Sequence, residues 1–407
     1  MTVAAVPIDW AAARRVAYDA GRAAISATGA VRGVPLADAD GLTLAEPLVT
    51  LTDLPAFPTS SVDGWAVRGG GPWRIVGRVL AGGTPEPLAE DGTCVEIATG
   101  AMVPPGTATI VRVEDSTVRD GVVDGEPRAP KEWRDPGEEA TRGEELLPAG
   151  TAVTPAVIGL AASCGYETLP VHPLPAAAVL VFGDELLTSG TPGGGRVRDA
   201  LGPALPSWLR RLGATPVAGH APAGPIEDTL EAHVAAIQRA VAAGAALICT
   251  TGGTMRGPVD HLHPAIAKLA GEYVINTVAV RPGFPMLLAR LPGGQLLAGL
   301  PGNPQSAIVA LASLVSPLLA GLGGRALPPL LPATLGADIP GRGDSTHLAL
   351  VGAGADGTVY PLRHVGSAML RGLAGAVGFA VIPPGTSGSK GAPAQVVPLP
   401  LLDGERP

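Results

Sequence analysis

Side chains that could do chemistry follow three apolar runs in the second half of the chain. Asp184 and Glu185 come directly after the run 176–182, in the segment GDELL, and the run 245–250 leads into TTGGT and then Asp260. The run 296–300 leads into PGNPQS. Glycines let backbone N–H groups approach an anion, and Mg²⁺ prefers carboxylates plus phosphate oxygens. The three loops together indicate a phosphate-bearing ligand held partly through Mg²⁺, although any one alone is more often a tight turn with a helix cap.

A parallel sheet is expected to position these loops. Near-continuous apolar runs are typical of strands that are buried on both faces. The pattern between and after them predicts helices at about 199–213 with Asp199 as N-cap, at 226–243, from near Val259, and at 304–320. Strands that alternate with such helices form βαβ units, so one doubly wound α/β domain is expected, with the three loops at the carboxyl edge of its sheet.

The remaining segments are predicted to be β-rich or mixed. A helix is expected at 8–30 and another at 155–164, whereas short β-prone runs with Gly and Pro turns occupy 55–135 and the tail from 327. The fold class is therefore α/β plus β. The predicted domains are 1–54 with 136–173 as a mixed α/β linker domain, 55–135 as a β-rich domain, 174–323 as the α/β domain, and 324–407 as a C-terminal β domain.

Composition narrows the class of protein. A net charge of −8 excludes a polybasic nucleic-acid binder, and 46% hydrophobic residues argue against wholesale disorder. The cysteines Cys94, Cys164 and Cys249 are far apart and lie in apolar surroundings, which predicts buried thiols. The longest apolar run, 307–322, is shorter than the roughly 18 residues of a membrane span. A soluble cytoplasmic protein without nucleic-acid or membrane partners is expected.

Two motifs of the N-terminal half complete an ordered set. The set reads SSVDGWAVR, ATGAMVPPG, GDELL, TTGGTMRGPVD, VRPGFP, LPGNP and HVGSAML. In this order the motifs resemble the molybdopterin molybdenumtransferases, the MoeA and gephyrin E-domain family, over about residues 8–390. The resemblance implies an elongated four-domain subunit in a homodimer. The active cleft would lie between the α/β, molybdopterin-binding domain of one subunit and the β-rich lid domain of the other.

The resemblance also implies a reaction and a set of residues. The reaction is Mg²⁺-dependent cleavage of adenylylated molybdopterin with insertion of molybdate, which gives molybdenum cofactor and AMP. The upstream molybdopterin adenylyltransferase is implied as a further partner. The implied catalytic residues are Asp63, Thr99, Glu185 and Asp260, and the implied metal ligands are Asp184, Glu185 and Asp260. The implied substrate-binding residues are Gly252, Gly253, Gly257, Arg281, Pro301, Gly302, Asn303 and Ser367.

Departures from the family pattern concentrate at residues that would bind the molybdate oxyanion. Arg281 and Phe284 stand where the family's KPGKP has lysines, and Met255 stands where its GGVSxG loop has serine. The family's SANG segment has lost its Ser and Asn at 375–378. Losing one charged hydrogen bond to a desolvated anion costs on the order of 1.5–3 kcal/mol, roughly a ten- to hundredfold loss in affinity. Arginine supplies all but three of the 28 basic residues, so base composition explains Arg281 but not Phe284.

Two interpretations of these departures stay open. Drift with compensation, for example by Arg256 or Arg371, would leave an active molybdenumtransferase. Alternatively, the chain is a diverged paralogue that binds a pterin nucleotide or related ligand without efficient molybdate insertion. An adenylyltransferase fits less well, because such an enzyme needs only the α/β domain. His261 and His263 lie beside Asp260, but residues i and i+2 of a helix do not face one way, so capping or surface histidines are favoured over a metal pair.

Overall fold

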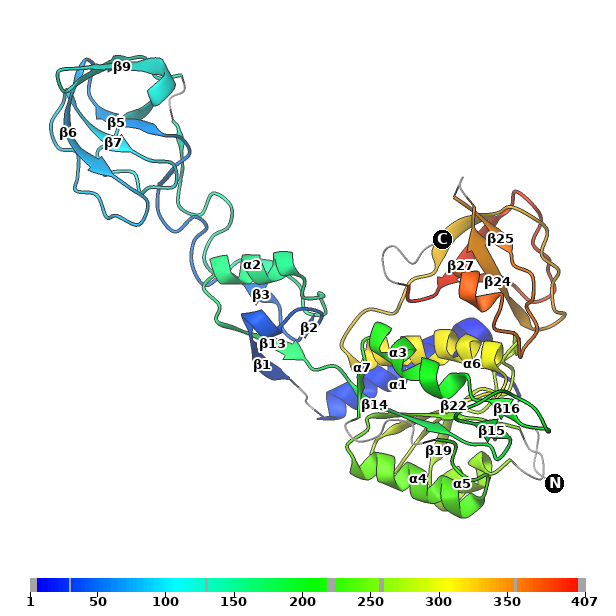
Figure 1. The fold of residues 1–407 in the computed structure, drawn as a ribbon. Coiled ribbons are helices and arrows are strands. Elements are labelled where there is room, and N and C mark those ends of the chain that lie inside the picture. The colour runs from blue at the N-terminus through cyan, green and yellow to red at the C-terminus, as the bar shows by residue number, and fades with distance from the viewer. Residues whose placement is uncertain are drawn as a thin grey trace. The chain divides into compact units, whose positions relative to one another are not determined.

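The chain folds into two compact units (Figure 1). The computed structural model describes residues 6–28, 31–128, 131–217, 224–255, 260–354 and 357–401. The first unit comprises Met1–Arg32, Gly41–Thr43 and His172–Pro407, and the second comprises Gly33–Asp40 and Leu44–Val171. The first unit holds the predicted α/β and C-terminal β segments, and the second holds the β-rich segment.

The central sheet of the first unit aligns three of its loops at one edge. Its strand order is β17-β14-β18-β22-β21-β19. The bounds are β14 Ala176–Val181, β17 Thr215–Pro216, β18 Leu247–Thr251, β19 Glu272–Ile275, β21 Leu287–Arg290 and β22 Leu296–Leu300. β14, β18 and β22 run parallel, with Val181 opposite Thr251 and Thr251 opposite Leu300. The three carboxyl ends are therefore level, and the loops that follow them emerge side by side.

Helices cover both faces of this sheet, as Figure 1 shows. α4 (Leu230–Ala242) and α5 (Leu262–Lys268) cover one face, where Ile237 and Leu262 pack against Ile248 of β18. The other face carries α1 (Trp10–Thr28), α3 (Leu201–Arg211), α6 (Pro304–Ala310), the π-helical segment η3 (Leu311–Val315) and α7 (Ser316–Leu322). Because both faces are buried, the strands are apolar along their whole length.

The helical stretch Pro304–Leu322 is the most apolar part of the chain. By length and hydropathy it is the one stretch within the described residues that could cross a membrane, but 94% of it is buried inside the fold. Trp10 of α1 donates its indole N–H to Ser313 Oγ at 2.9 Å, inside η3. This stretch is therefore a core helix, and its first residues are held rigidly beneath the PGN loop.

A closed β-barrel forms the rest of the first unit. Its strands are β20 Val280–Arg281, β23 Leu331–Leu335, β24 Thr346–Ala353, β25 Thr358–Pro361, β26 Gly378–Ile382 and β27 Pro393–Pro398. They pair in the order β20-β24-β25-β23-β27-β26, and β24 also pairs with β26, which closes the ring. β20 belongs to this barrel although it lies between two strands of the central sheet in sequence, and it places Arg281 opposite His347. A short turn, η4 (Leu373–Gly375), precedes β26.

The second unit is built mainly from short strands. A sheet in the order β8-β5-β7-β6-β10-β9 contains β5 Gly64–Arg68, β6 Trp73–Val79, β7 Thr93–Ile97, β8 Thr109–Arg112, β9 Ser116–Arg119 and β10 Val122–Gly125. Smaller pairings join β1 Arg32–Pro35, β2 Thr43–Leu44 and β13 Thr168–His172, then β3 Leu48–Val49 and β12 Glu145–Leu147, then β4 Thr59–Ser60 and β11 Trp133–Arg134. α2 is Pro155–Ser163, and the turns η1 and η2 are Leu36–Asp38 and Val113–Asp115.

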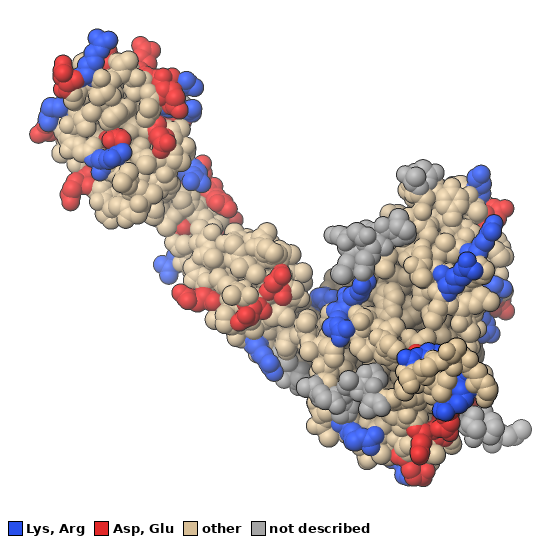
Figure 2. Space-filling model, viewed as in Figure 1, with Lys and Arg blue, Asp and Glu red and all other residues tan. Residues whose placement is uncertain are grey.

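Charges on the β-rich part of the second unit are paired. Arg68 contacts Asp91, Arg74 contacts Glu90, and Arg78 contacts Glu96, at 3.0–3.1 Å. Figure 2 accordingly shows basic and acidic side chains interspersed on the visible face of this part. Exposed pairs of this kind contribute little to stability, but they prevent a single-sign surface.

The sequence predicted most elements within a few residues of their observed bounds. The clearest difference is α4, which begins at Leu230 and not near 226, because Thr229 caps it by accepting a hydrogen bond from the Ala232 N–H at 3.2 Å. β19 and β21 were not predicted, and both run antiparallel to their neighbours, so the sheet is mixed. Cys94, Cys164 and Cys249 are buried and free, as predicted, and burial raises the pKa of Cys249 to about 12.

Candidate functional site

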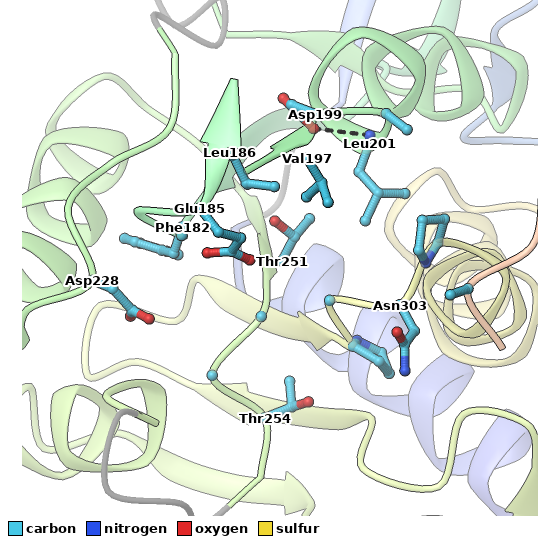
Figure 3. A pocket seen from close by; sticks show the side chains of 18 of the residues that line it. Phe182, Glu185, Leu186, Val197, Asp199, Leu201, Asp228, Thr251, Thr254 and Asn303 are labelled. Atoms are coloured by element: carbon cyan, nitrogen blue, oxygen red, sulfur yellow. Dashed lines mark hydrogen bonds between the residues drawn. The ribbon is translucent and has the colours of Figure 1, made fainter. Parts of the chain in front are cut away.

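A cavity of about 830 Å³ lies at the carboxyl edge of β14, β18 and β22 (Figure 3). We call it the acidic cavity, because Glu185, Asp228 and Asp260 line it. Of the other residues predicted to form a site, Gly252, Gly253, Pro301, Gly302 and Asn303 also line it. The parallel pair β15 (Leu186–Leu187) and β16 (Val197–Arg198) forms another part of the wall. The structure thus brings the three strand-end loops together around one space.

The loop after β14 turns Glu185 toward the cavity. Gly183 has a φ of +141°, and a Cβ there would lie 2.7 Å from Glu185 Oε2, so a larger residue would collide with this carboxylate. Asp184 turns differently: its Oδ1 accepts the Asp228 N–H at 3.3 Å. The N-cap position of α3 is Ala200, and not Asp199 as predicted; Asp199, one residue earlier, accepts the N–H groups of Leu201 and Gly202 at 3.0 and 2.9 Å. Figure 3 shows Glu185 and Asp228 projecting from neighbouring loops.

The loops after β18 and β22 approach each other through glycines. Gly252 and Gly253 have φ values of +85° and +64°, which L side chains rarely adopt. The Gly252 N–H donates to Leu300 O at 3.0 Å. His263 braces the same loop, because its Nε2 lies 3.2 Å from Thr254 O and its Nδ1 lies 2.6 Å from the Tyr273 hydroxyl. Both ring nitrogens of His263 therefore contact neighbouring groups of the fold.

Asp228 is an acid of this cavity that the sequence analysis missed. Its Oδ1 is buried without a hydrogen-bond partner among the described residues, and it lies 3.8 Å from His233 Nε2. Burial raises the pKa of Asp228; His233 and His261 oppose the shift, and the negative charges of Asp184 and Glu185 add to it. The only signal for Asp228 in the sequence was its place beside Thr229, the cap of α4.

His233 is buried beside Asp228. The ring is fully buried and stacks on Phe182 with centroids 3.6 Å apart. Its Nδ1 lies 2.8 Å from Thr229 O, and a carbonyl only accepts, so Nδ1 carries the proton. Burial lowers the pKa of His233, which favours the neutral ring and leaves Nε2 as an acceptor facing the Asp228 carboxylate. Two unpaired acceptors so close together would be stabilised by a cation or by a proton donor.

The acids fit a magnesium ion that is completed by its substrate. Among the described residues, no three His, Cys, Asp or Glu side chains lie close enough to form a ready-made metal site. Mg²⁺ is commonly held by one or two carboxylates together with substrate phosphates, so a complete protein cage is not required. The unpaired Asp228 Oδ1 and the mutual repulsion of Asp184, Glu185 and Asp228 are what a cation would relieve.

Arg281 and Ser367 line a different cavity, of about 540 Å³. We call it the basic cavity, because Arg281, Arg342 and His347 line it together with Gln305. The guanidinium carbon of Arg281 lies 4.7 Å from the centroid of the Phe284 ring, within the range of a cation–π contact. Phe284 therefore contacts the Arg281 guanidinium through its ring, whereas the lysine of the family pattern would add a second cation.

The two cavities share their dividing segments. Pro304 lines the acidic cavity and the next residue, Gln305, lines the basic one; likewise Ala368 lines the acidic cavity and Ser367 the basic one. The Ser306 N–H donates to Ser367 O at 3.2 Å and joins the two segments. One ligand could therefore extend from one cavity into the other past these two segments.

Asp63 and Thr99 belong to the second unit. Asp63 Oδ1 accepts the Thr99 N–H at 2.6 Å and the Thr99 hydroxyl at 3.0 Å. These two bonds, the backbone one first, lower the pKa of Asp63 against a small opposing effect of burial. The Arg112 guanidinium braces this loop by binding both carboxylate oxygens of Glu132, at 2.9 and 3.0 Å. Asp63 is thus held as an exposed carboxylate.

The positions that depart from the family pattern are spread over the first unit. Met255 is 58% exposed and lines the acidic cavity. Gly375 ends η4, and Val377 is half-buried beside β26. Arg371 is exposed. The predicted substrate-binding residue Gly257 and the compensating Arg256 lie outside the described residues.

Family models match almost the whole chain. The MoeA N-terminal region (domain I and II) matches residues 9–165, a probable molybdopterin binding domain matches 178–321, and the MoeA C-terminal region (domain IV) matches 332–399. A molybdopterin molybdenumtransferase of Synechococcus elongatus is 33% identical over 307 residues, covering 71% of this chain and 75% of that protein. Molybdopterin molybdenumtransferase 2 of Mycobacterium tuberculosis is 34% identical over 312 residues, covering 70% and 74%.

A solved structure agrees with the fold. The molybdopterin biosynthesis MoeA protein of Pyrococcus horikoshii superposes with a TM-score of 0.79 at 24% identity, covering 98% of this chain and 100% of that one. At this identity the match supports the multi-domain architecture, whereas the sequence relatives support the family. The chain belongs to the MoeA family of molybdopterin molybdenumtransferases.

Proposed function

We propose that the chain inserts molybdate into adenylylated molybdopterin, with Mg²⁺ and with release of AMP. The observation that carries the proposal is the pair of adjoining cavities of opposite charge, divided by Pro304–Gln305 and Ser367–Ala368. A pyrophosphate with its cation suits the acidic cavity, and a tetrahedral oxyanion suits the basic one. A transferase that joins the two substrates needs both sites side by side.

In the acidic cavity, Glu185 and Asp260 with Asp228 would hold Mg²⁺, and Asp184 would orient the loop through its bond to the Asp228 N–H. The ion would supply charge neutralisation of the pyrophosphate during its cleavage. Gly252, Gly253 and Gly302 leave room for the phosphates to approach the backbone, and Asn303 lies beside them at the start of α6. Catalysis there is mainly positioning and electrostatics.

In the basic cavity, Arg281 and Ser367 would bind molybdate, as the family resemblance implies. Arg281 is a fixed charge with several donors, and its stack on Phe284 limits the orientations it must give up on binding. Pro301 and Gly302, in the loop after β22, line the neighbouring acidic cavity. The oxyanion would so be kept close to the pterin end of the substrate.

Asp63 and Thr99 complete the proposed machinery from the second unit. The family resemblance implies a homodimer in which these residues face the acidic cavity of the other subunit. The carboxylate of Asp63, held ionised by Thr99, would position the attacking oxygen. The same resemblance implies a cytoplasmic enzyme that receives its substrate from the upstream molybdopterin adenylyltransferase.

The test is AMP release by the purified protein given adenylylated molybdopterin, Mg²⁺ and molybdate. The proposal expects AMP release that needs Mg²⁺ and is coupled to formation of molybdenum cofactor. The exposed Glu231, whose carboxylate lies 4.0 Å from Lys268 on α5, gives a matched control, because Glu231→Gln removes a charge outside both cavities. No AMP release under any metal condition would overturn the proposal.

A diverged ligand-binding paralogue is the second candidate. Phe284 offers no donor to an oxyanion, and the exposed Met255 places an apolar side chain on the acidic cavity. This candidate expects pterin-nucleotide binding without any dependence on molybdate. Cofactor synthesis restored by this chain in a transferase-deficient cell would exclude it.

A further inference from the structure

The basic cavity is lined by Gln305, a buried residue whose amide oxygen has no partner among the described residues. Gln305 is 1% exposed, and its Oε1 is buried without a hydrogen-bond partner within the described part of the chain. An unsatisfied acceptor costs free energy in a core, and an oxyanion, which has no proton to donate, can relieve that cost only if the amide turns. An amide can turn either its oxygen or its NH₂ to the same side, so Gln305 can also donate to an anion.

Two permanent charges and one conditional charge line the same cavity. Arg281 and Arg342 contribute guanidinium cations. His347 differs, because Pro340 O lies 2.7 Å from its Nδ1, which must therefore carry a proton. The proton that His347 can gain or lose is consequently the one on Nε2.

The surroundings of His347 favour its neutral form. Burial lowers its pKa; the bond to Pro340 opposes that shift, and the charge of Arg342 adds to it. β20 presents Arg281 opposite His347, and β26 presents Ile382. The charge that acts on this ring is the cationic Arg342, and a bound dianion would oppose its effect.

We propose that the basic cavity binds a tetrahedral oxyanion dianion together with one proton, which His347 takes up at Nε2, while Arg281, Arg342 and Gln305 select the ligand. This inference rests on the proposed function for the identity of the anion, molybdate. It goes further by assigning Gln305, Arg342 and His347 to the site and by making anion affinity depend on pH. The pKa of His347 is higher when the dianion is bound than when the cavity is empty. Affinity therefore rises as pH falls, because protonation of His347 strengthens its attraction to the anion.

The experiment is calorimetric titration of the full chain with dilute molybdate at several pH values between about 5.5 and 8.5, each in two buffers of different ionisation enthalpy. Each unit by which the anion raises the pKa of His347 strengthens binding up to about tenfold at the acidic end. We expect roughly tenfold tighter binding at the acidic end and about half a proton taken up per molybdate near the middle of the range.

Variants make the test specific. His347→Gln should give weak binding that no longer changes with pH, and His347→Arg should give tight binding without proton uptake. His364→Asn is the matched control: His364 is exposed, does not line the cavity, and has a φ of +59° that asparagine tolerates, so the wild-type profile should persist.

Wild-type binding that is flat with pH, or no molybdate binding at any pH, overturns the inference. The proposed function is judged separately by AMP release. An inactive protein that still takes up molybdate with a proton would leave this inference standing, whereas an active one with pH-independent binding would remove it alone.

Discussion

The acidic and basic cavities lie on either side of Pro304–Gln305 and Ser367–Ala368, and their charged side chains have opposite signs. In the acidic cavity, burial raises the pKa of Asp228 and the charges of Asp184 and Glu185 add to the rise, while Asp228 Oδ1 has no partner among the described residues. In the basic cavity, burial and then the charge of Arg342 lower the pKa of His347, and Gln305 Oε1 likewise has no partner among the described residues. Each cavity is incomplete alone, and each is completed by a ligand of the opposite sign. Like charges at close range destabilise the free protein. A cluster of them therefore indicates a site where a ligand of the opposite charge binds.

The largest expected effect comes from removing one carboxylate charge from the acidic cavity. Glu185→Gln keeps the size of the side chain but removes its charge, so AMP release should fall about a hundredfold. Molybdate affinity should stay within about twofold, because Glu185 does not line the basic cavity. AMP release and calorimetry measure the two effects, and an equal loss in both would mean that the cavities do not act separately.

Breaking the basic cavity should give the complementary result. Arg281→Ala removes a charged donor, so molybdate affinity should fall about ten- to hundredfold, equivalent to roughly 1.5–3 kcal/mol. Binding of Mn²⁺, used as a paramagnetic substitute for Mg²⁺, should not change. Arg290→Ala provides the control, since Arg290 is exposed at the end of β21 and lines neither cavity. The comparison fails if Arg290→Ala weakens molybdate binding as much as Arg281→Ala.

Gln305→Met should separate stability from binding. It replaces an unsatisfied buried amide with an apolar side chain of similar size, so the free energy of unfolding should rise by about 1 kcal/mol. Molybdate affinity should fall about three- to tenfold, because one uncharged hydrogen bond is lost. Urea unfolding and calorimetry test the pair of effects. If the stability falls and molybdate affinity does not change, the amide serves the fold and not a ligand.

The smallest expected effect concerns Asp63, the acid whose environment is opposite to that of Asp228. Thr99 lowers the pKa of Asp63 by two hydrogen bonds, so its charge is favoured above that lowered pKa and the benefit fades as pH falls through it. Thr99→Val removes the hydroxyl and keeps the backbone N–H, which is the larger cause. The pKa of Asp63 should therefore rise only part of the way toward its ordinary value, as NMR titration of the carboxyl carbon would measure. An unchanged pKa would contradict the assigned bond.

The sequence was most informative where chemistry follows a buried strand. Glu185, Gly252 and Pro301 could be expected together because parallel strands end at one edge, and they do line one cavity. Asp228 escaped because it precedes a helix in a loop, and only the fold brings that loop beside Phe182. Tertiary structure, not local pattern, decides that kind of neighbourhood.

Arg281 and Gln305 show a second limit. Arg281 lies between strands of the central sheet in sequence, yet β20 pairs with β24 of the barrel and moves it to the other cavity. Gln305 looks like an ordinary helix residue, and its unsatisfied amide is visible only once the packing around α6 is known. Pairing partners and burial had to be known before either residue could be given a role.

The most direct test of two sites with opposite ligands is a crystal of the protein soaked with molybdate and Mn²⁺, with anomalous maps recorded for each element. The account predicts the molybdenum peak in the basic cavity, near Arg281, Gln305 and His347, and the manganese peak in the acidic cavity, near Glu185, Asp228 and Asp260. Molybdenum bound among the carboxylates, or both peaks in one cavity, would contradict it.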